Sequence, residues 1–119
     1  MTTDPVADAD SYTEQLGKQQ DAFQRARERA EMEIRTGFAA WFSGSGGAVP
    51  CVIFSGGGMR VLYQPAVEAI DDAADYKETI QAHNDVLQGR ITIEQYRDAL
   101  VNKYIAMQAD EIAQLWSAA

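Results

Sequence analysis

The stretch from Ala48 to Tyr63, AVPCVIFSGGGMRVLY, constrains the fold more than any other part of this sequence. Two runs of β-branched, aromatic and long apolar residues lie on either side of Ser55-Gly-Gly-Gly58. Residues of these types suit a pleated, partly buried strand. Gly56 and Gly57 can both adopt positive φ without a Cβ clash, as the central pair of a primed β-turn requires. The sequence therefore predicts one β-hairpin.

With Gly56 and Gly57 at the centre of the turn, Phe54 faces Met59 and Val52 faces Val61, although three successive glycines also allow a shift by one residue. The apolar runs are nearly continuous, which predicts that both faces of the hairpin are covered. A two-stranded hairpin is marginal by itself and has two unpaired edges. We therefore expect its edges or its second face to meet another chain.

Ten residues are predicted to form contacts between chains, because they lie on the hairpin, in a basic patch, or on a surplus apolar face. They are Arg25, Arg27, Arg29, Phe54, Met59, Val61, Leu62, Tyr63, Tyr104 and Trp116. For the three arginines the alternative is pairing within their own helix, with Glu28, Glu31 and Glu33.

A long helix is predicted before the hairpin. Ser11-Tyr-Thr-Glu14 matches a capping box, and apolar residues then recur at helical spacing from Leu16 to Trp41. The helix is expected from Tyr12 to about Phe42, roughly 45 Å at 1.5 Å per residue, so that part of it projects past the core. Residues 1–10 are expected to form a flexible acidic arm, and residues 11–119 a single domain.

Two further helices are predicted after the hairpin. The first runs from Pro65 to a stop at Gly89 and carries an apolar stripe. The second opens at a capping box, Thr92-Ile-Glu-Gln95, and ends near Trp116. The short connection between them predicts antiparallel packing. The stripe of the first consists of Ile70, Ala73, Tyr76, Ile80, His83 and Leu87. The expected fold class is α+β, mainly α.

The composition of the chain excludes several classes of function. The chain has 119 residues and a net charge of −8, which disfavours sequence-independent binding to duplex phosphates. Its single cysteine, Cys51, excludes an internal disulfide and indicates a small buried thiol. No apolar run approaches the ~20 residues of a membrane span, and no signal peptide is recognisable. We therefore expect no membrane association and no secretion.

Two features, an acidic cluster and the single histidine, can each be interpreted as a functional site or as a structural feature. Asp71-Asp-Ala-Ala-Asp75, with Glu68 and Glu78 nearby, is either a magnesium-binding cluster of a small helical nucleotide pyrophosphatase or a solvated acidic face. His83 has no obvious catalytic partners, and a hydrogen-bonded imidazole in or near the core is expected. No catalytic residue, metal ligand or cofactor site is predicted, and the chain is expected not to be an enzyme.

From about Gln24 to Ile80 the expected order is helix, glycine-rich connector, hairpin and helix. With Ala48-Val-Pro-Cys-Val-Ile-Phe54, Gly57-Gly-Met-Arg-Val-Leu-Tyr63 and Pro65-Ala-Val-Glu-Ala-Ile70, this order resembles the W-type head-to-tail joining (completion) proteins of tailed phages. The resemblance implies a structural protein that forms a ring beneath the portal, contacts other virion proteins and DNA in a channel, and resides in the virion or the host cytoplasm. The other alternative is a bacterial adaptor that binds a partner protein.

Overall fold

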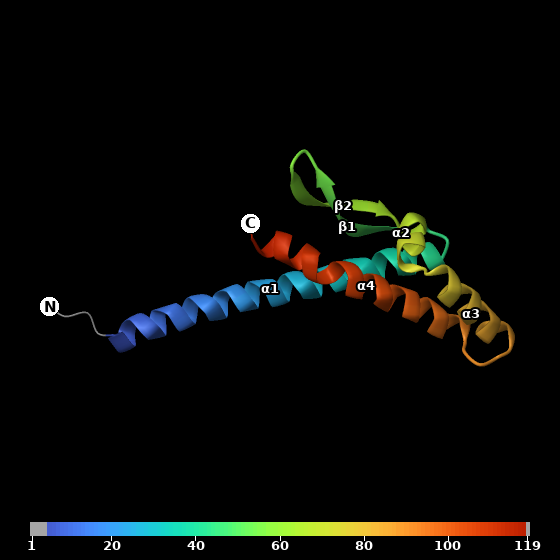
Figure 1. Cartoon of the computed structure of the whole chain (residues 1–119), viewed down its shortest axis with the longest axis horizontal. Coiled ribbons are helices and arrows are strands. Elements are labelled where there is room, and N and C mark those ends of the chain that lie inside the picture. Colours follow the sequence, from blue (N-terminus) through green and yellow to red (C-terminus); the bar gives the residue numbers. More distant parts are fainter. Residues whose placement is uncertain (1–4, 119) are drawn as a thin grey trace.

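The computed structural model describes the backbone of residues 5–118 and the side chains of Glu14 and residues 16–118. The fold is α+β and mainly helical, as predicted, with a long first helix, one antiparallel hairpin and helices after it (Figure 1). The elements are α1 (Pro5–Phe42), β1 (Ala48–Ser55), β2 (Gly58–Pro65), α2 (Ala66–Ala73), α3 (Tyr76–Leu87) and α4 (Ile93–Ser117).

The core lies between α1 and α4, with β1 and α2 packed against them. Ala30, Ile34 and Phe38 form the buried stripe of α1, at the three- and four-residue spacing of one helix face. The Phe38 ring meets the ring of Tyr104 from α4 edge to face, with centroids 5.4 Å apart. This arrangement is the favoured one for two aromatic rings. The two long helices therefore form the frame on which the hairpin sits.

The predicted end of α1 at Phe42 is confirmed, but the helix begins at Pro5 and not at Tyr12. Ser11 lies inside the helix, so the capping-box pattern does not mark its start. Of the predicted flexible arm, residues 5–10 belong to α1, and residues 1–4 lie outside the described residues. The first half of α1 extends beyond the other elements, in a molecule of 75 × 36 × 25 Å (Figure 1).

The hairpin has the predicted register, with Phe54 opposite Met59 and Val52 opposite Val61. Its turn is formed by Gly56 at φ 59° and Gly57 at φ 84°. Both angles lie in the left-handed region that a primed turn requires and that glycine adopts without strain. The turn chemistry therefore sets the register.

The glycine-rich connector between α1 and β1 is a close-packed turn. Gly47 adopts φ 97°, and a Cβ built on it would lie 2.2 Å from the Gly37 carbonyl oxygen. A Cβ built on Gly37 would in turn lie 2.1 Å from the carbonyl oxygen of Ala48. The sequence predicts a flexible spacer here. The structure instead shows that the lack of a side chain at Gly37 and Gly47 lets the backbones of α1 and β1 come into contact.

The predicted helix from Pro65 to Gly89 is two helices, α2 and α3. The break falls at Ala74 and Asp75, and the Asp75 side chain accepts hydrogen bonds from the backbone N–H groups of Lys77 and Glu78. Asp75 is therefore the N-cap of α3. The stop at Gly89 is confirmed, with φ 73° after the last turn of α3.

α4 opens at the predicted capping box, in which Thr92 and Gln95 exchange hydrogen bonds between side chain and backbone. α3 and α4 pack antiparallel after a short turn, as predicted (Figure 1). The buried stripe predicted for α3 is wrong, because Tyr76, Ile80 and Leu87 are 80%, 45% and 71% exposed. The break at Asp75 changes the direction of the chain, and α3 turns the smaller Thr79 and Ala82 towards α4.

Candidate interaction surface

The two edges of the hairpin differ in what covers them. Along the outer edge of β1, the backbone N–H of Val52 donates to Oε1 of Gln108 at 3.1 Å. On the same edge the Tyr104 hydroxyl donates to the Pro50 carbonyl oxygen at 2.9 Å. Pro50 itself has no N–H to satisfy. Side chains of α4 therefore take the place of a third strand beside β1.

Tyr104 belongs to this internal network. It is fully buried, and its hydroxyl also accepts a hydrogen bond from Nε2 of Gln64 at 3.0 Å. Burial raises the pKa of Tyr104 to about 12, because the phenolate would lose its hydration. The structure thus places Tyr104 in the core of its own chain, whereas the sequence predicted it at a contact with another chain.

The outer edge of β2 is open. Ser55 and Gly58 close the two-residue turn as a hydrogen-bonded pair, and hydrogen-bonded and non-hydrogen-bonded pairs alternate from there. The backbone N–H and C=O groups of Met59, Val61 and Tyr63 therefore point away from β1. Among the described residues these groups have no hydrogen-bond partner.

Apolar side chains gather beside this open edge. Phe54 is 81% exposed at the tip of the hairpin, and Met59, Leu62 and Tyr63 are also exposed. Val61 is half-buried against the core. These five predicted contact residues all lie on the hairpin, with Leu62 on the opposite face of the sheet from the other four. Together we call them the hairpin surface.

Tyr63 is held at the base of the hairpin surface by α1. Its hydroxyl donates to Oε1 of Glu33 at 2.6 Å. This hydrogen bond to a carboxylate raises the pKa of Tyr63, with a smaller contribution from burial. The ring therefore has a fixed position, although about half of the residue is exposed.

Arg27 forms its ion pairs within its own chain. Its guanidinium pairs with Glu31 one turn along α1 and with Asp110 of α4, each at 2.7 Å. These two partners raise the pKa of Arg27, and Asp110 makes the larger contribution. Arg27 therefore joins α1 to α4.

Arg29 is used in the same way. It pairs with Glu33 at 2.8 Å, and its guanidinium lies 4.0 Å from the centre of the Trp116 ring. A cation over an aromatic face is attracted by the ring quadrupole. Trp116 is half-buried beneath it, so both predicted contact residues already have a partner in their own chain. Arg25 is exposed, and no ion pair involves it among the described side chains.

The acidic residues around α2 do not converge on a common point. Glu68, Asp71 and Asp72 are exposed on α2, and Asp75 is engaged as the cap of α3. No group of three or more His, Cys, Asp or Glu residues in the described part of the chain could hold a metal ion. The break at Asp75 thus removes the single helix face on which the magnesium-binding alternative depended.

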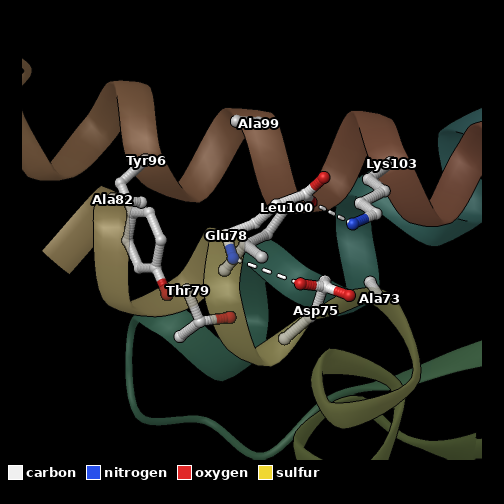
Figure 2. A pocket seen from close by; sticks show the side chains of 10 residues that line it. Ala73, Asp75, Glu78, Thr79, Ala82, Tyr96, Ala99, Leu100 and Lys103 are labelled. Carbon is white, nitrogen blue, oxygen red and sulfur yellow. Dashed lines mark hydrogen bonds and ion pairs between the residues drawn. The ribbon is translucent and has the colours of Figure 1, made fainter.

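A small cavity of about 120 Å³ lies between α3 and α4 (Figure 2). Figure 2 shows the Tyr96 side chain pointing from α4 towards α3, and Lys103 of α4 forms an ion pair with Glu78. The Thr79 hydroxyl is buried, with no hydrogen-bond partner among the described residues. Ligand pockets usually measure about 300–1,000 Å³. The cavity therefore reflects loose packing of α3 rather than a built substrate site.

The remaining candidates are Cys51 and His83. Cys51 is a buried free thiol, as predicted, and desolvation raises its pKa, with a smaller contribution from Asp72. A raised thiol pKa means less reactive thiolate at neutral pH. His83 is exposed on α3, so the prediction of an imidazole in or near the core is wrong.

Comparison with protein-family models, with curated proteins and with solved structures finds no match to this chain. Over the described residues, none of the helices is both long and apolar enough to cross a lipid bilayer. The hairpin surface is therefore identified as a candidate interaction surface from its geometry alone. Sequence reasoning missed Gln64 and Gln108, which decide which edge of the hairpin is covered; nothing local to either residue indicates that role.

Proposed function

We propose that this chain is a non-enzymatic structural protein that assembles with copies of itself. The observation that carries the proposal is the hairpin surface, where exposed apolar side chains flank an unpaired strand edge. Soluble monomers rarely leave both features uncovered, because such edges pair with other chains. Burial of this apolar area would favour association by roughly 25 cal/mol per Å², before the entropic cost of association.

The most specific form of this proposal is a head–tail connector or completion component of a tailed phage. Its support is the order of elements, in which a helix, a glycine-rich connector, a hairpin with a glycine turn and a helix follow one another. Such a component would form a ring, meet other virion proteins, and contact DNA in its channel. Arg25, which forms no ion pair with the side chains that the structure describes, is the basic residue of the patch best placed to serve such a contact.

The mass of the assembly in solution tests both levels of the proposal. Light scattering coupled to size-exclusion chromatography should give a mass above 13.1 kDa, the mass of one chain. A ring visible by electron microscopy would support the connector. A particle of two chains would support self-association without the connector, and a monomer at high micromolar concentration would contradict both.

An adaptor that binds a different protein is the second candidate, and one observation favours it. α3 presents Tyr76, Ile80 and Leu87 to solvent along one face, at the spacing that helix-in-groove partners recognise. A monomeric mass would favour this candidate. The magnesium-dependent enzyme gains no support from the described residues, and titration calorimetry with Mg²⁺ should show no saturable site.

A further inference from the structure

The open edge of β2 specifies the kind of partner that covers it. Backbone N–H and C=O groups project outward at every second residue, at Met59, Val61 and Tyr63. Groups at this spacing are satisfied together by another extended backbone, which adds a strand to the sheet. A helix or a globular surface does not present donors and acceptors in that pattern. A partner that satisfies all of these groups would therefore supply a β-strand.

The other edge of the same hairpin shows how a protein blocks this kind of pairing. β1 has Pro50, and side chains from α4 occupy its outward-pointing groups. In the described structure β2 has no such cover, and β1 lies between it and the long helices (Figure 1). Edge strands are commonly protected by charge, proline or cover. Between Gly58 and Gln64 the only such device is the single charge of Arg60.

Charge favours a second copy of this chain as the source of the strand. The chain has a net charge of −8, so most approaches of two copies bring carboxylates together. The hairpin from Ala48 to Pro65 contains no acidic residue, and Arg60 is its one charged residue. α2 and α3 carry acidic residues beside their exposed apolar side chains, so that two copies meeting there bring carboxylates together. The hairpin is thus the part of the chain where two copies meet with least repulsion.

We propose that β2 pairs antiparallel with β2 of a second copy, with Leu62 opposite Leu62 of that copy, to form a continuous four-stranded sheet. In this register Val61 and Tyr63 exchange backbone hydrogen bonds across the pair, and each Arg60 faces a Gln64. Centring the pair on Arg60 would place two guanidinium groups directly opposite, which is unfavourable. Centring it on Val61 would place Arg60 against Leu62 and lose the apolar pair.

This inference rests on the proposed self-assembly and is independent of the connector. The same surface patch is used by both copies, so the contact closes as a dimer with two-fold symmetry. A larger particle would need a second contact between dimers.

Cysteine cross-linking tests the register. In a Cys51→Ala background, Leu62→Cys places two thiols at a non-hydrogen-bonded pair, with Cα atoms about 4.5 Å apart, which suits a disulfide. The matched variant Arg60→Cys places its two thiols roughly 13 Å apart along the strands, beyond the reach of a disulfide. In a glutathione redox buffer we expect a covalent dimer from Leu62→Cys and none from Arg60→Cys. Both positions are exposed, so folding is preserved.

A charge variant gives a second readout. Leu62→Glu places two carboxylates opposite each other and should weaken association at least about tenfold. Ile80→Glu on α3 is the matched control, since Ile80 is 45% and Leu62 44% exposed. It should leave association unchanged.

The outcomes separate the two proposals. If the protein self-associates but Leu62→Cys gives no dimer, or Arg60→Cys cross-links equally well, the strand pairing is wrong and self-assembly stands. Equal weakening by Leu62→Glu and Ile80→Glu would also overturn the pairing. A monomer at all concentrations overturns both.

Discussion

At the scale of single residues, the Tyr104 hydroxyl connects three elements. It belongs to α4, accepts a hydrogen bond from Gln64 of β2, and donates one to the Pro50 carbonyl of β1. No other described side chain bonds to both strands of the hairpin. Because the residue is fully buried, loss of the hydroxyl would leave the Pro50 oxygen without its partner. Tyr104 therefore fixes the base of the hairpin on the helical frame.

The raised pKa of Tyr104 predicts a loss of stability at high pH. Its pKa is about 12 in the folded chain and roughly 10 in the unfolded chain. The folded state thus favours the neutral phenol, and this contribution to the free energy of unfolding is fully present below pH ~10 and lost as pH rises through about 12. Urea denaturation should show a steeper fall over this interval for the wild type than for Tyr104→Phe.

Groups that ionise in both proteins cancel in this comparison, so the difference in slope reports Tyr104. At neutral pH Tyr104→Phe should also lower the free energy of unfolding by about 1–3 kcal/mol, since a buried acceptor loses its donor. Tyr76→Phe is the matched control, because Tyr76 is 80% exposed, and it should change neither quantity. Parallel pH profiles for the wild type and Tyr104→Phe would show that the phenol is not shielded from water.

At the scale of elements, the contact between α1 and β1 depends on the absence of a side chain at Gly37. A Cβ there would lie 2.1 Å from the Ala48 carbonyl oxygen and 2.6 Å from Cγ1 of Val49. Gly37→Ala should therefore destabilise the protein by about 3 kcal/mol or more, because the backbone must move to make room for the methyl group. Gly17→Ala in the same helix meets nothing within 4 Å and should stabilise it by up to about 1 kcal/mol.

Thermal and urea unfolding of the two glycine variants measure this difference in sign. Both changes add the same methyl group to α1, so intrinsic helix propensity acts equally on each. If Gly37→Ala were as stable as Gly17→Ala, the close approach of α1 and β1 would not exist in solution.

The start of α3 depends on its cap. Asp75→Ala removes the acceptor for two backbone N–H groups and should cost about 1 kcal/mol, with faster hydrogen exchange concentrated in the first turn of α3. Asp71→Ala on α2 is the control, since Asp71 is exposed and caps no helix. A Mg²⁺-dependent gain in stability that both variants abolish would instead indicate a shared cation site.

Elements with local signals could be predicted from the sequence. The hairpin register follows from Gly56 and Gly57, and the start of α4 from Thr92 and Gln95, because these signals act over a few residues. The break before α3 had a local signal too, since Asp75-Tyr-Lys-Glu78 resembles a capping box. The helical spacing that continues across it concealed the break.

Features that depend on distant contacts could not be predicted in this way. The cover of β1 comes from Gln108 and Tyr104, which lie 56 and 54 positions along the chain from the groups they bind. The apolar residues of the hairpin surface could be singled out from the sequence because they lie within one short stretch, from Phe54 to Tyr63. Which of its two edges is open follows only from the tertiary fold.

At the scale of the whole molecule, α4 packs along only part of the length of α1 (Figure 1). Among the described side chains of α1, the first buried one is Ala30. Glu14, Leu16 and the residues from Lys18 to Asp21 are exposed. The ion pairs that join α1 to other elements also begin later, at Arg27. The projecting part of α1 therefore contributes little to the stability of a single chain.

Deletion of residues 1–17 should change the free energy of unfolding by less than about 1 kcal/mol, because the side chains described in this segment, Glu14 and Leu16, are exposed. Ile34→Ala, in the same helix but fully buried, should cost about 2–5 kcal/mol. Urea denaturation below the concentration at which the chain associates measures both. A deletion as costly as Ile34→Ala would mean that the projecting segment packs on the core. A deletion that lowers stability only at higher protein concentration would place that segment in a contact between copies, since association stabilises the folded chain by mass action.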